Sequence, residues 1–367
     1  MDYSFELNNA KRDETFATGK VNVKSPVVEV FSAMVNGEEI GKFGKKADVA
    51  AQYIMDLGSK ASMGDQSAMS ELNEIRKFVI QPRLLQEIKL LGLFGSYKQL
   101  GWGETAYLEK ITYENVRADI QAEGQDVSTA FSRRTKTPLA PIVISGGHKV
   151  NYREIALGDM TTENTLIGEV HKEIKNKATL YVIETVFNAI EAATGVKYFY
   201  DAAGLAKTDV DALLTKIRRY GKPNVNGDYA VLAQFIPWVG YAGNVGANAI
   251  TGISQKVLDE IADTGLVGAY NGAVLKEIPN GYNFNKLTAD GSNYDTLLPA
   301  GLAFVTPTAP AGGVAAIQTF SIGGLTSFSG NSVSTGEIMS RYDLSIAAGV
   351  AQTDAIGVIH DTNLDSL

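Results

Sequence analysis

Residues 161–194, TTENTLIGEVHKEIKNKATLYVIETVFNAIEAAT, carry the pattern that decides the fold. Apolar residues recur three or four positions apart, which is the spacing of one helical face. They are Ile167, Val170, Ile174, Ala178 and Tyr181. The expected helix is about 50 Å long, at about 1.5 Å per residue, and a sustained heptad that would favour a coiled coil is absent. We therefore expect a single long helix that spans two parts of the protein.

Composition limits the class of protein. The chain has 367 residues, of which 45% are hydrophobic and 20% charged, as in globular proteins. This length can bury one large core or two ordinary ones. The net charge of −8 argues against a broad nucleic-acid-gripping face, although it is compatible with a protein that encloses nucleic acid. The absence of cysteine excludes disulfides, thiolate metal sites and cysteine nucleophiles.

The sequence shows neither a targeting segment nor a membrane span. The first residues, MDYSFELNNAKRDE, are acidic and polar, which is unlike a signal peptide. No apolar run approaches the roughly 20 residues of a transmembrane helix. We therefore expect a soluble protein that is made in the cytoplasm.

Residues 1–43 have the composition of an arm. The first 20 are polar with isolated aromatic residues, and residues 20–35, KVNVKSPVVEVFSAMV, predict one or two short strands. Such a segment buries little of itself, so we expect it to pack on other parts, a neighbouring subunit included. Helices follow at 45–60 and 65–80, the second capped by Asp65, and Pro82 is expected to break or restart that helix.

Residues 95–159 predict a long two-stranded ribbon. One strand falls within 101–120, with Tyr107 and Ile111 on one side and Leu108 on the other. Residues 121–138 are polar and are expected to be flexible, and 141–157 read as one or two returning strands. An isolated ribbon is marginal in water. We expect its partner surface to be another copy of the chain.

The second half of the chain predicts a compact unit of alternating helices and strands. The expected elements are helices at 208–220 and 254–265 and strands at 229–239, 266–278 and 298–307. In the second helix, Val257, Leu258 and Ile261 are expected to face inward. Residues 315–358 are rich in strand-forming sequence, and we expect them to complete the sheet of the first domain.

The search for catalytic chemistry finds little. His148, His171 and His360 are far apart and lack metal-ligand spacing, so structural roles are expected. The glycine-rich stretches 37–42, 101–103 and 243–246 do not match the phosphate-loop or dinucleotide fingerprints. We therefore expect no catalytic residue, no metal site and no cofactor.

Several charged and aromatic residues could either contact a partner or ligand or serve only the local structure of the chain. Arg133, Arg134 and Lys136 predict a basic group at the tip of the ribbon, which meets a neighbour's carboxylates or forms a solvated loop. The arginines at 218–219 are expected at the C-terminal end of a helix, where positive charge interacts favourably with the helix dipole, so no ligand is needed to explain them. Trp102 and Trp238 are expected to be packing anchors.

The order of these parts resembles the major capsid proteins of tailed double-stranded-DNA bacteriophages, which have the Hong Kong 97 fold. Two stretches, 265–274 (GLVGAYNGAV) and 340–350 (SRYDLSIAAGV), are similar to strand regions of that family. The resemblance implies an α+β fold made of six parts. They are an N-terminal arm (1–43), peripheral-domain helices (44–94), an extended loop or β-ribbon (95–159), a spine helix (160–199), a mixed α/β axial domain (200–306) and return strands of the peripheral domain (307–367).

The resemblance also implies a function. The chain would self-assemble into hexamers and pentamers of an icosahedral head that encloses double-stranded DNA without sequence-specific binding. Its partners would be further copies of itself, portal and scaffolding proteins and decoration proteins, with no membrane involved. It would reside in the virion capsid after assembly in the host cytoplasm. Since no scaffolding segment of long charged helices is evident, a separate scaffolding protein or a processed chain is expected.

Two other functions stay open at the level of sequence. One is an encapsulin-type cage, which resembles the same fold and encloses cargo enzymes. A neighbouring portal or terminase gene would favour the phage head, and a cargo-enzyme gene the cage. The other is a soluble enzyme with a pocket in residues 200–306, which would remain a monomer or small oligomer with a defined ligand site.

Overall fold

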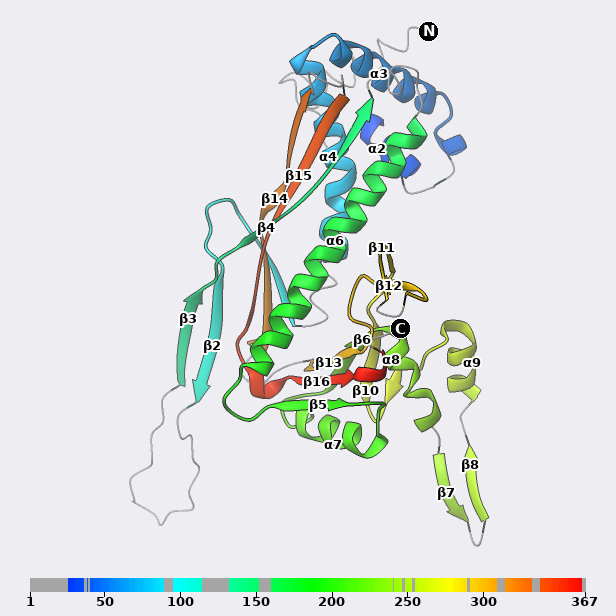
Figure 1. The fold of residues 1–367 in the computed structure, drawn as a ribbon, viewed down its shortest axis with the longest axis vertical. Helices are drawn as coiled ribbons and strands as arrows, with labels where there is room; N and C mark the ends of the chain where they lie inside the picture. Colours follow the sequence, from blue (N-terminus) through cyan, green and yellow to red (C-terminus); the bar gives the residue numbers. More distant parts are fainter. Residues whose placement is uncertain are drawn as a thin grey trace, which may run out of the picture.

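The body of the protein is elongated, with a long helix and a long sheet that run along it and a smaller mixed unit at one end (Figure 1). The fold comes from a computed structural model. It describes residues 26–35, 38, 40–88, 95–113, 132–151, 160–239, 241–245, 248–252, 255–288, 291–308, 314–331 and 337–364. The first 25 residues of the expected arm and the expected flexible residues 121–131 lie outside the described residues.

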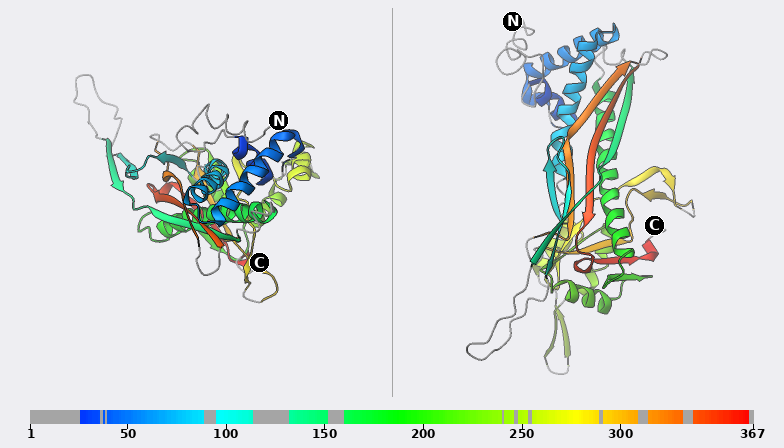
Figure 2. Two further views of the ribbon diagram at one scale, coloured as in Figure 1. Left: turned by 90° about the horizontal axis from the view of Figure 1, so that it is seen from above. Right: turned by 90° about the vertical axis from the view of Figure 1, so that its left-hand side faces the viewer.

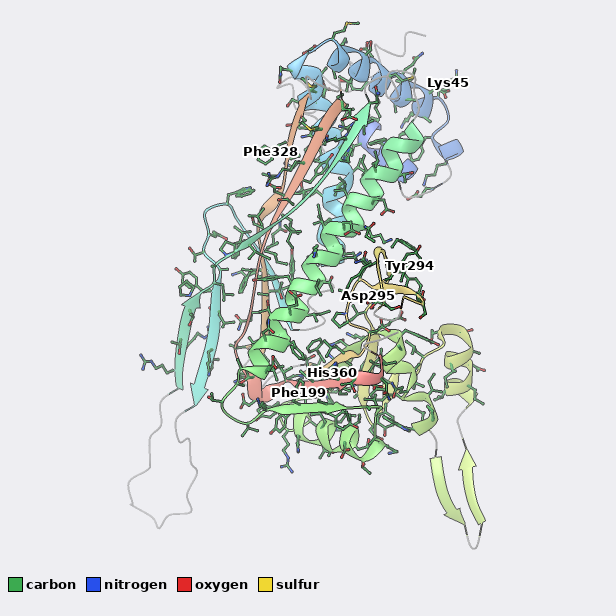
Figure 3. The ribbon with its side chains drawn as sticks, in the orientation of Figure 1. Lys45, Phe199, Tyr294, Asp295, Phe328 and His360 are labelled. Atoms are coloured by element: carbon green, nitrogen blue, oxygen red, sulfur yellow. The ribbon has the colours of Figure 1, made fainter. Side chains whose placement is uncertain are left out.

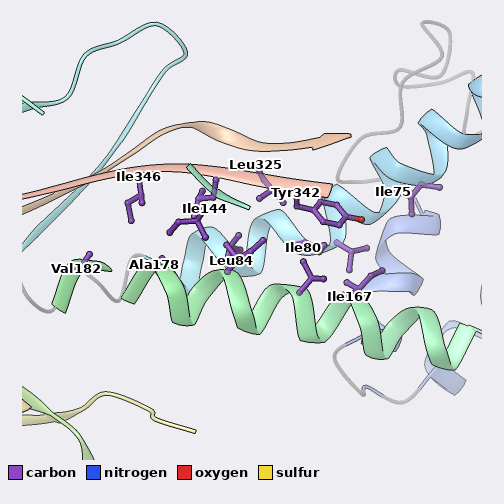
Figure 4. Packing of buried hydrophobic residues seen from close by; sticks show 14 of the residues in the cluster. Ile75, Ile80, Leu84, Ile144, Ile167, Ala178, Val182, Leu325, Tyr342 and Ile346 are labelled. Atoms are coloured by element: carbon purple, nitrogen blue, oxygen red, sulfur yellow. The ribbon is translucent and has the colours of Figure 1, made fainter. Parts of the chain in front are cut away.

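The long helix is confirmed as α6 (Met160–Glu191). Its predicted stripe is buried from Ile167 through Ile174 and Ala178, and burial continues to Ile190. Figure 4 shows Ile167, Ala178 and Val182 along the side of α6 that faces the rest of this core. Because each fully buried aliphatic side chain contributes about 1.5–3 kcal/mol, tertiary packing rather than helix propensity holds α6 in place.

Three further helices cover the upper part of the body (Figure 1). They are α2 (Pro26–Val35), α3 (Lys45–Ser62) and α4 (Gln66–Ile88). Asp65 caps α4 as predicted, since its carboxylate accepts from the backbone amides of Ser67 (2.9 Å) and Ala68 (3.3 Å).

Two predictions in this region are wrong. The strands expected in 20–35 are replaced, over the described part, by α2, whose Val27, Val30 and Phe31 are buried. Pro26 sits at the first position of this helix, where its fixed φ is favourable. Pro82 does not interrupt α4, because packing on α6 and the sheet holds the helix continuous past it.

A four-stranded sheet lies against α4 and α6, in the order β1-β14-β15-β4. Its strands are β1 (Ser96–Leu100), β14 (Ile317–Asn331), β15 (Glu337–Val350) and β4 (Ile142–Asn151). The C-terminal strands thus complete the sheet of the first domain, as expected. The ribbon is shorter than the range 95–159, because β1 and β4 belong to this sheet. In β4, Ile144, His148 and Val150 are buried, so one face of this strand packs on the core.

A second sheet of six strands lies across the foot of α6, in the order β5-β16-β13-β6-β10-β9. The strands are β5 (Tyr198–Ala202), β6 (Pro223–Gly227), β9 (Ala269–Tyr270), β10 (Ala273–Glu277), β13 (Leu302–Pro307) and β16 (Gly357–Asp361). Phe304 and Val358 belong to the same core as α6, whereas Val305 and Ile359 pack with α7 (Lys207–Ile217) in a second core. Although residues 307–367 were expected to return to the peripheral sheet, β16 joins this one.

Two sequence predictions in the mixed unit are corrected. Residues 229–239 form helix α8 (Tyr229–Ala233) and a 3-10 turn (Ile236–Trp238) instead of a strand. The carboxylate of Asp228 accepts from the amide of Ala230 at 2.7 Å, so a local cap overrides the apolar run. Residues 266–278 are a hairpin rather than one strand, since Asn271 (φ 47°) and Gly272 (φ 76°) form its two-residue turn.

The remaining elements include α9 and three two-stranded hairpins. Helix α9 (Gln255–Thr264) forms near its predicted position, but Leu258 is exposed instead of inward. The hairpins are β2 (Tyr107–Tyr113) with β3 (Ser132–Pro138), β7 (Tyr241–Val245) with β8 (Asn248–Gly252), and β11 (Tyr282–Leu287) with β12 (Tyr294–Thr296). Figure 2 shows β7/β8 and β11/β12 projecting from the body in different directions. The α+β fold class, with ribbon, long helix and mixed unit, is confirmed.

Candidate assembly surfaces

The β2/β3 ribbon is antiparallel and in continuous register from Tyr107–Pro138 to Tyr113–Ser132. Within the described part of the chain it pairs with no other strand. Alternation places Glu109, Arg134 and Lys136 on one face and Arg133 on the other. A two-stranded ribbon needs further packing to be stable. The contacts that hold the root of this ribbon on the body are described next.

One side chain of the four-stranded sheet, Gln318, hydrogen-bonds to the root of the ribbon. The amide of Gln318 in β14 accepts from the backbone N–H of Glu109 (3.0 Å) and donates to the carbonyl of Glu109 (2.7 Å). It also donates to the carbonyl of Ala315 at 3.2 Å. Gln318 is only 5% exposed. These contacts satisfy polar groups that would otherwise be costly to bury.

A small apolar core supports the same junction. Leu100, Ala106, Phe320, Ile322 and Ala347 are buried together, and the half-buried Leu139 packs on them. Leu139 also donates from its backbone N–H to the carbonyl of Ala106, at 2.8 Å. The ribbon is therefore fixed at its root by both apolar packing and hydrogen bonds.

An open cleft of about 820 Å³ lies between the ribbon root and the end of the four-stranded sheet. Its charged lining residues are Lys98, Glu109, Arg134 and Lys136. Glu109 lies 3.0 Å from Lys136 Nζ and 3.6 Å from Arg134 Nη1. The hydrogen bond from Lys136, with the nearby positive charges, lowers the pKa of the Glu109 carboxyl. Three cations therefore face one carboxylate, so the cleft is basic.

The three basic residues predicted as a candidate contact group are not one cluster. Arg134 and Lys136 line the cleft and interact with Glu109 of the same chain, whereas Arg133 is exposed on the opposite face. All three lie within strand β3 and not in a loop at the tip. Their role in contacts between subunits stays a prediction. Sequence reasoning also missed Gln318. An amide within an apolar strand was the available signal, but it did not indicate that the partner would be the backbone of Glu109.

A second candidate surface, which sequence reasoning missed, is the β11/β12 hairpin. Tyr282, Phe284, Leu287 and Tyr294 are between 41% and 68% exposed. The rings of Phe284 and Tyr294 meet edge to face at 5.2 Å, and Figure 3 places Tyr294 beside Asp295 on this hairpin. Clustered exposed aromatic residues are typical of protein–protein contacts. The alternation of aromatic residues at 282 and 284 was the feature of the sequence that could have indicated this surface.

The outer face of the four-stranded sheet carries a third group. Phe328 is 58% exposed and lies opposite Arg341 in the strand register. Arg341 donates to Asp343 (2.8 Å) and to Ser145 of β4 (3.0 Å). Figure 3 shows Phe328 on the side of the sheet away from α6. This face combines apolar and polar groups, as interfaces do.

The other residues singled out in the sequence have structural surroundings. His148 is buried and stacks on Tyr342 at 5.9 Å, His171 is buried in α6, and Nδ1 of His360 lies 2.9 Å from Asp201. Trp238 packs on Phe235 at 5.2 Å. Trp102 is 64% exposed, although its ring covers Gly323 in β14.

The described residues were also compared with the requirements of a metal site, a ligand-binding cation and a membrane span. Among the described residues, no group of three or more histidine, aspartate or glutamate side chains is arranged to hold a metal ion. Arg218, at the end of α7, donates to the carbonyl of Asn271 at 3.1 Å. None of the helices in the described ranges is both long and apolar enough to cross a membrane.

Comparison with known protein families gives a match that covers most of the chain. Residues 14–360 match the family described as "SPbeta prophage-derived putative capsid protein YonB". A comparison with curated protein sequences gave no match.

Solved structures provide distant similarities. The chain is similar to the virus-like particle from Pyrococcus furiosus (10% identity, TM-score 0.45, 77% of this chain and 97% of that one). It is also similar to the mature capsid of bacteriophage PhiM1 (13%, 0.44, 74% and 86%). A third similarity is to the SrpI encapsulin of Synechococcus elongatus (10%, 0.44, 76% and 88%). At these identities and TM-scores, the similar structures do not distinguish a phage head from a protein cage. The assignment of the chain to a family rests on the family match.

The match extends over the ribbon, the long helix and both sheets. These are the parts that the resemblance to Hong Kong 97-type capsid proteins implied. The chain belongs to the YonB family of SPbeta prophage-derived capsid proteins, and its role is that of a structural subunit of a capsid shell.

Proposed function

We propose that the chain assembles with copies of itself into hexamers and pentamers, which together close an icosahedral phage head around double-stranded DNA. The observation that carries this proposal is the ribbon. Its outer half extends beyond the packed root and pairs with no other strand in the described part of the chain. Another copy of the subunit would supply the missing surface, and many identical contacts would then stabilise a closed shell.

The arrangement of parts supports distinct roles in such a shell. The mixed unit around the six-stranded sheet would be the axial domain at the symmetry axes, and α6 with the four-stranded sheet would be the peripheral domain. Because β16 pairs within the six-stranded sheet and β1 and β4 within the four-stranded one, β16 would belong to the axial domain and β1 and β4 to the peripheral domain. The net charge of −8 would weaken binding of packaged DNA to the shell.

Other components belong to the same proposal. A scaffolding protein would guide assembly, a portal would occupy one vertex, and decoration proteins would bind the outside. Assembly would take place in the host cytoplasm, and the chain would need no cofactor or catalytic residue.

Size-exclusion chromatography with light scattering, followed by negative-stain imaging of the largest species, tests the proposal. Closed shells, or hexamers and pentamers that convert to shells, are expected. A lasting 39.3 kDa monomer that does not assemble, with or without co-expressed phage proteins, would contradict it. Shells that contain DNA after nuclease treatment would distinguish a phage head from a cage that carries protein cargo.

A further inference from the structure

The basic cleft beside the ribbon root is lined by charged side chains from two separate sheets. Arg134 and Lys136 belong to β3 of the ribbon, whereas Lys98 belongs to β1 of the four-stranded sheet. Glu109 of β2 lines the same cleft. Among the lining residues that the structure describes, Lys98 is the cation on the side of the body. The cleft therefore has positive charge on both of its sides.

The carboxylate of Glu109 balances part of this charge. Its oxygens lie 3.0 Å from Nζ of Lys136 and 3.6 Å from Nη1 of Arg134. The second distance exceeds that of a normal hydrogen bond, so Arg134 interacts with this carboxylate mainly through charge. The lowered pKa of Glu109 keeps its carboxyl ionised at neutral pH. Three positive groups and one negative group leave a local charge of +2 in the cleft.

We propose that this cleft binds a small phosphate-bearing anion, which bridges Lys98 of the body and Arg134 of the ribbon. A phosphate group carries a charge of about −1.5 to −2 at pH 7 and has three acceptor oxygens. It therefore matches the local charge and can accept hydrogen bonds from both sides of the cleft. Arginine forms paired hydrogen bonds to phosphate, and lysine binds it as a point charge. The bound anion would hold the ribbon root against the body.

The cleft has room for more than a bare phosphate ion. Its volume of about 820 Å³ lies within the range of about 300–1,000 Å³ that is usual for small-molecule sites. Tyr97, Tyr107 and Phe320 also line it. Aromatic rings offer a large apolar contact area to a ligand, so they would pack against the organic part of a phosphorylated molecule. Inorganic pyrophosphate is the minimal probe of the charged part of this site.

The charge of the whole chain favours a small anion over a nucleic acid. The net charge is −8, and a long polyanion would meet this charge over a wide face. A small anion meets chiefly the charges within about 8 Å, which is the screening length at physiological salt. The inference goes beyond the proposed self-assembly and does not depend on it, because both sides of the cleft belong to one chain.

Calorimetric titration of the full chain with inorganic pyrophosphate, at constant ionic strength, tests the site. Saturable binding of a single pyrophosphate per chain is expected. Lys98→Gln and Arg134→Gln should each weaken binding about three- to tenfold, because each variant loses a charge-assisted hydrogen bond at a partly exposed site. Arg133→Gln is the matched control. Arg133 lies on the opposite face of β3, so this variant should bind like the wild type.

Glu109→Gln should act in the opposite direction. It removes the carboxylate that competes with the ligand for Lys136, so pyrophosphate should bind about three- to tenfold more tightly. A variant that only disturbed the ribbon root would instead bind more weakly. Weaker binding by Glu109→Gln would therefore overturn the proposal. Equal losses in Arg133→Gln and Arg134→Gln, or the lack of saturable binding, would also overturn it.

Hydrogen exchange, measured by mass spectrometry, tests the bridge between the two sheets. Saturating pyrophosphate should slow exchange in β2 and β3 of the wild type and leave α7 unchanged. In Lys98→Gln most of this protection should be lost even at saturation, because the anion is then held from the ribbon alone. Unchanged protection of β2 and β3 in Lys98→Gln would refute the bridge.

Competition with a short DNA duplex separates a small-anion site from a nucleic-acid face. At equal phosphate concentration, the duplex should leave pyrophosphate bound, because the negative charge of the chain repels a long polyanion. Displacement of pyrophosphate by the duplex would assign the cleft to DNA and overturn the proposal.

Discussion

The side-chain amide of Gln318 hydrogen-bonds to both backbone polar groups of Glu109, with distances of 3.0 and 2.7 Å. An adjacent strand would make the same two bonds. The ribbon and the four-stranded sheet are separate sheets, yet this side chain joins β2 to β14 at one residue. A buried side chain therefore contributes to the attachment of the ribbon, together with the apolar core at its root.

Replacement of Gln318 by leucine should loosen the ribbon root. The change leaves the N–H and carbonyl of Glu109 without their partner, at a cost of about 1–3 kcal/mol. We expect faster hydrogen exchange in β2 and β3, with α6 unchanged, measured by mass spectrometry. Gln99→Leu is the control, since Gln99 makes one long 3.4 Å bond to Gly323. Equal exchange in both variants would show that Gln318 does not hold the ribbon.

The ribbon should lose stability in acid through Glu109. Its pKa is lowered in the folded chain, chiefly by the hydrogen bond from Lys136. Its contribution is therefore complete above the unfolded pKa of about 4.3, and it is lost as the pH falls through the lower folded pKa. The pair is partly exposed, so the effect should be about 0.2–1 kcal/mol. Protection factors of β3 between pH 6 and pH 3 would measure it, and Glu109→Gln should remove the dependence.

Gly323→Ala should destabilise the four-stranded sheet for two separable reasons. Gly323 has φ +71°, which costs other residues about 1–2 kcal/mol. An added Cβ would also lie 2.3 Å from the ring of Trp102. Thermal unfolding of Gly323→Ala, Trp102→Ala and the double variant should show coupling, because removal of the ring relieves only the clash. Additive changes would contradict this explanation.

Gly330→Ala is the matched control on the same strand. An added Cβ at Gly330 has no neighbour within 4 Å, and its φ is not positive. We expect a change in the free energy of unfolding within about 0.5 kcal/mol.

Asp361→Asn should weaken the six-stranded sheet near the end of β16. Burial would raise the pKa of Asp361, but bonds from Gln234 (2.6 Å) and the amides of Gly204 (2.7 Å) and Asn363 (3.0 Å) outweigh burial and lower it. The asparagine amide cannot accept all of these donors, so a loss of about 1.5–3 kcal/mol is expected. Denaturant unfolding would measure it.

The pH dependence at Asp361 has a defined direction. The depressed folded pKa means that the stabilisation is present above about pH 4 and is lost as the pH falls further. Asp201→Asn is the comparison, because Asp201 is exposed and its oxygen lies 2.9 Å from Nδ1 of His360. Its substitution should change stability little, and an equal loss in both variants would refute the argument.

The elements that follow from the sequence are those with a long, regular period. The stripe from Ile167 to Ala178 predicted α6, and the alternation along Tyr107–Tyr113 predicted β2. Asp65 gave a correct helix start because an N-cap is a local interaction. In each case the information lies within a few residues of the element itself.

The errors come from interactions that are distant or that compete with a local pattern. The loose alternation over residues 20–35 suggested strands, but packing of Phe31 and its neighbours on other helices selected α2. The position of β16 between β5 and β13 depends on strands far away in the sequence. Gln318 could not be recognised, because its partner is a backbone group 209 positions earlier.

The place of β16 has a consequence for biosynthesis. On the ribosome, β5 and β13 emerge well before the strand that lies between them. The gap between their edges can be filled only after Gly357–Asp361 has emerged, and contacts so distant in sequence form slowly. A nascent subunit thus cannot finish the sheet proposed to face the symmetry axes before residues 357–361 have left the ribosome. The order of synthesis itself would delay any contact that depends on the finished sheet until β16 is in place.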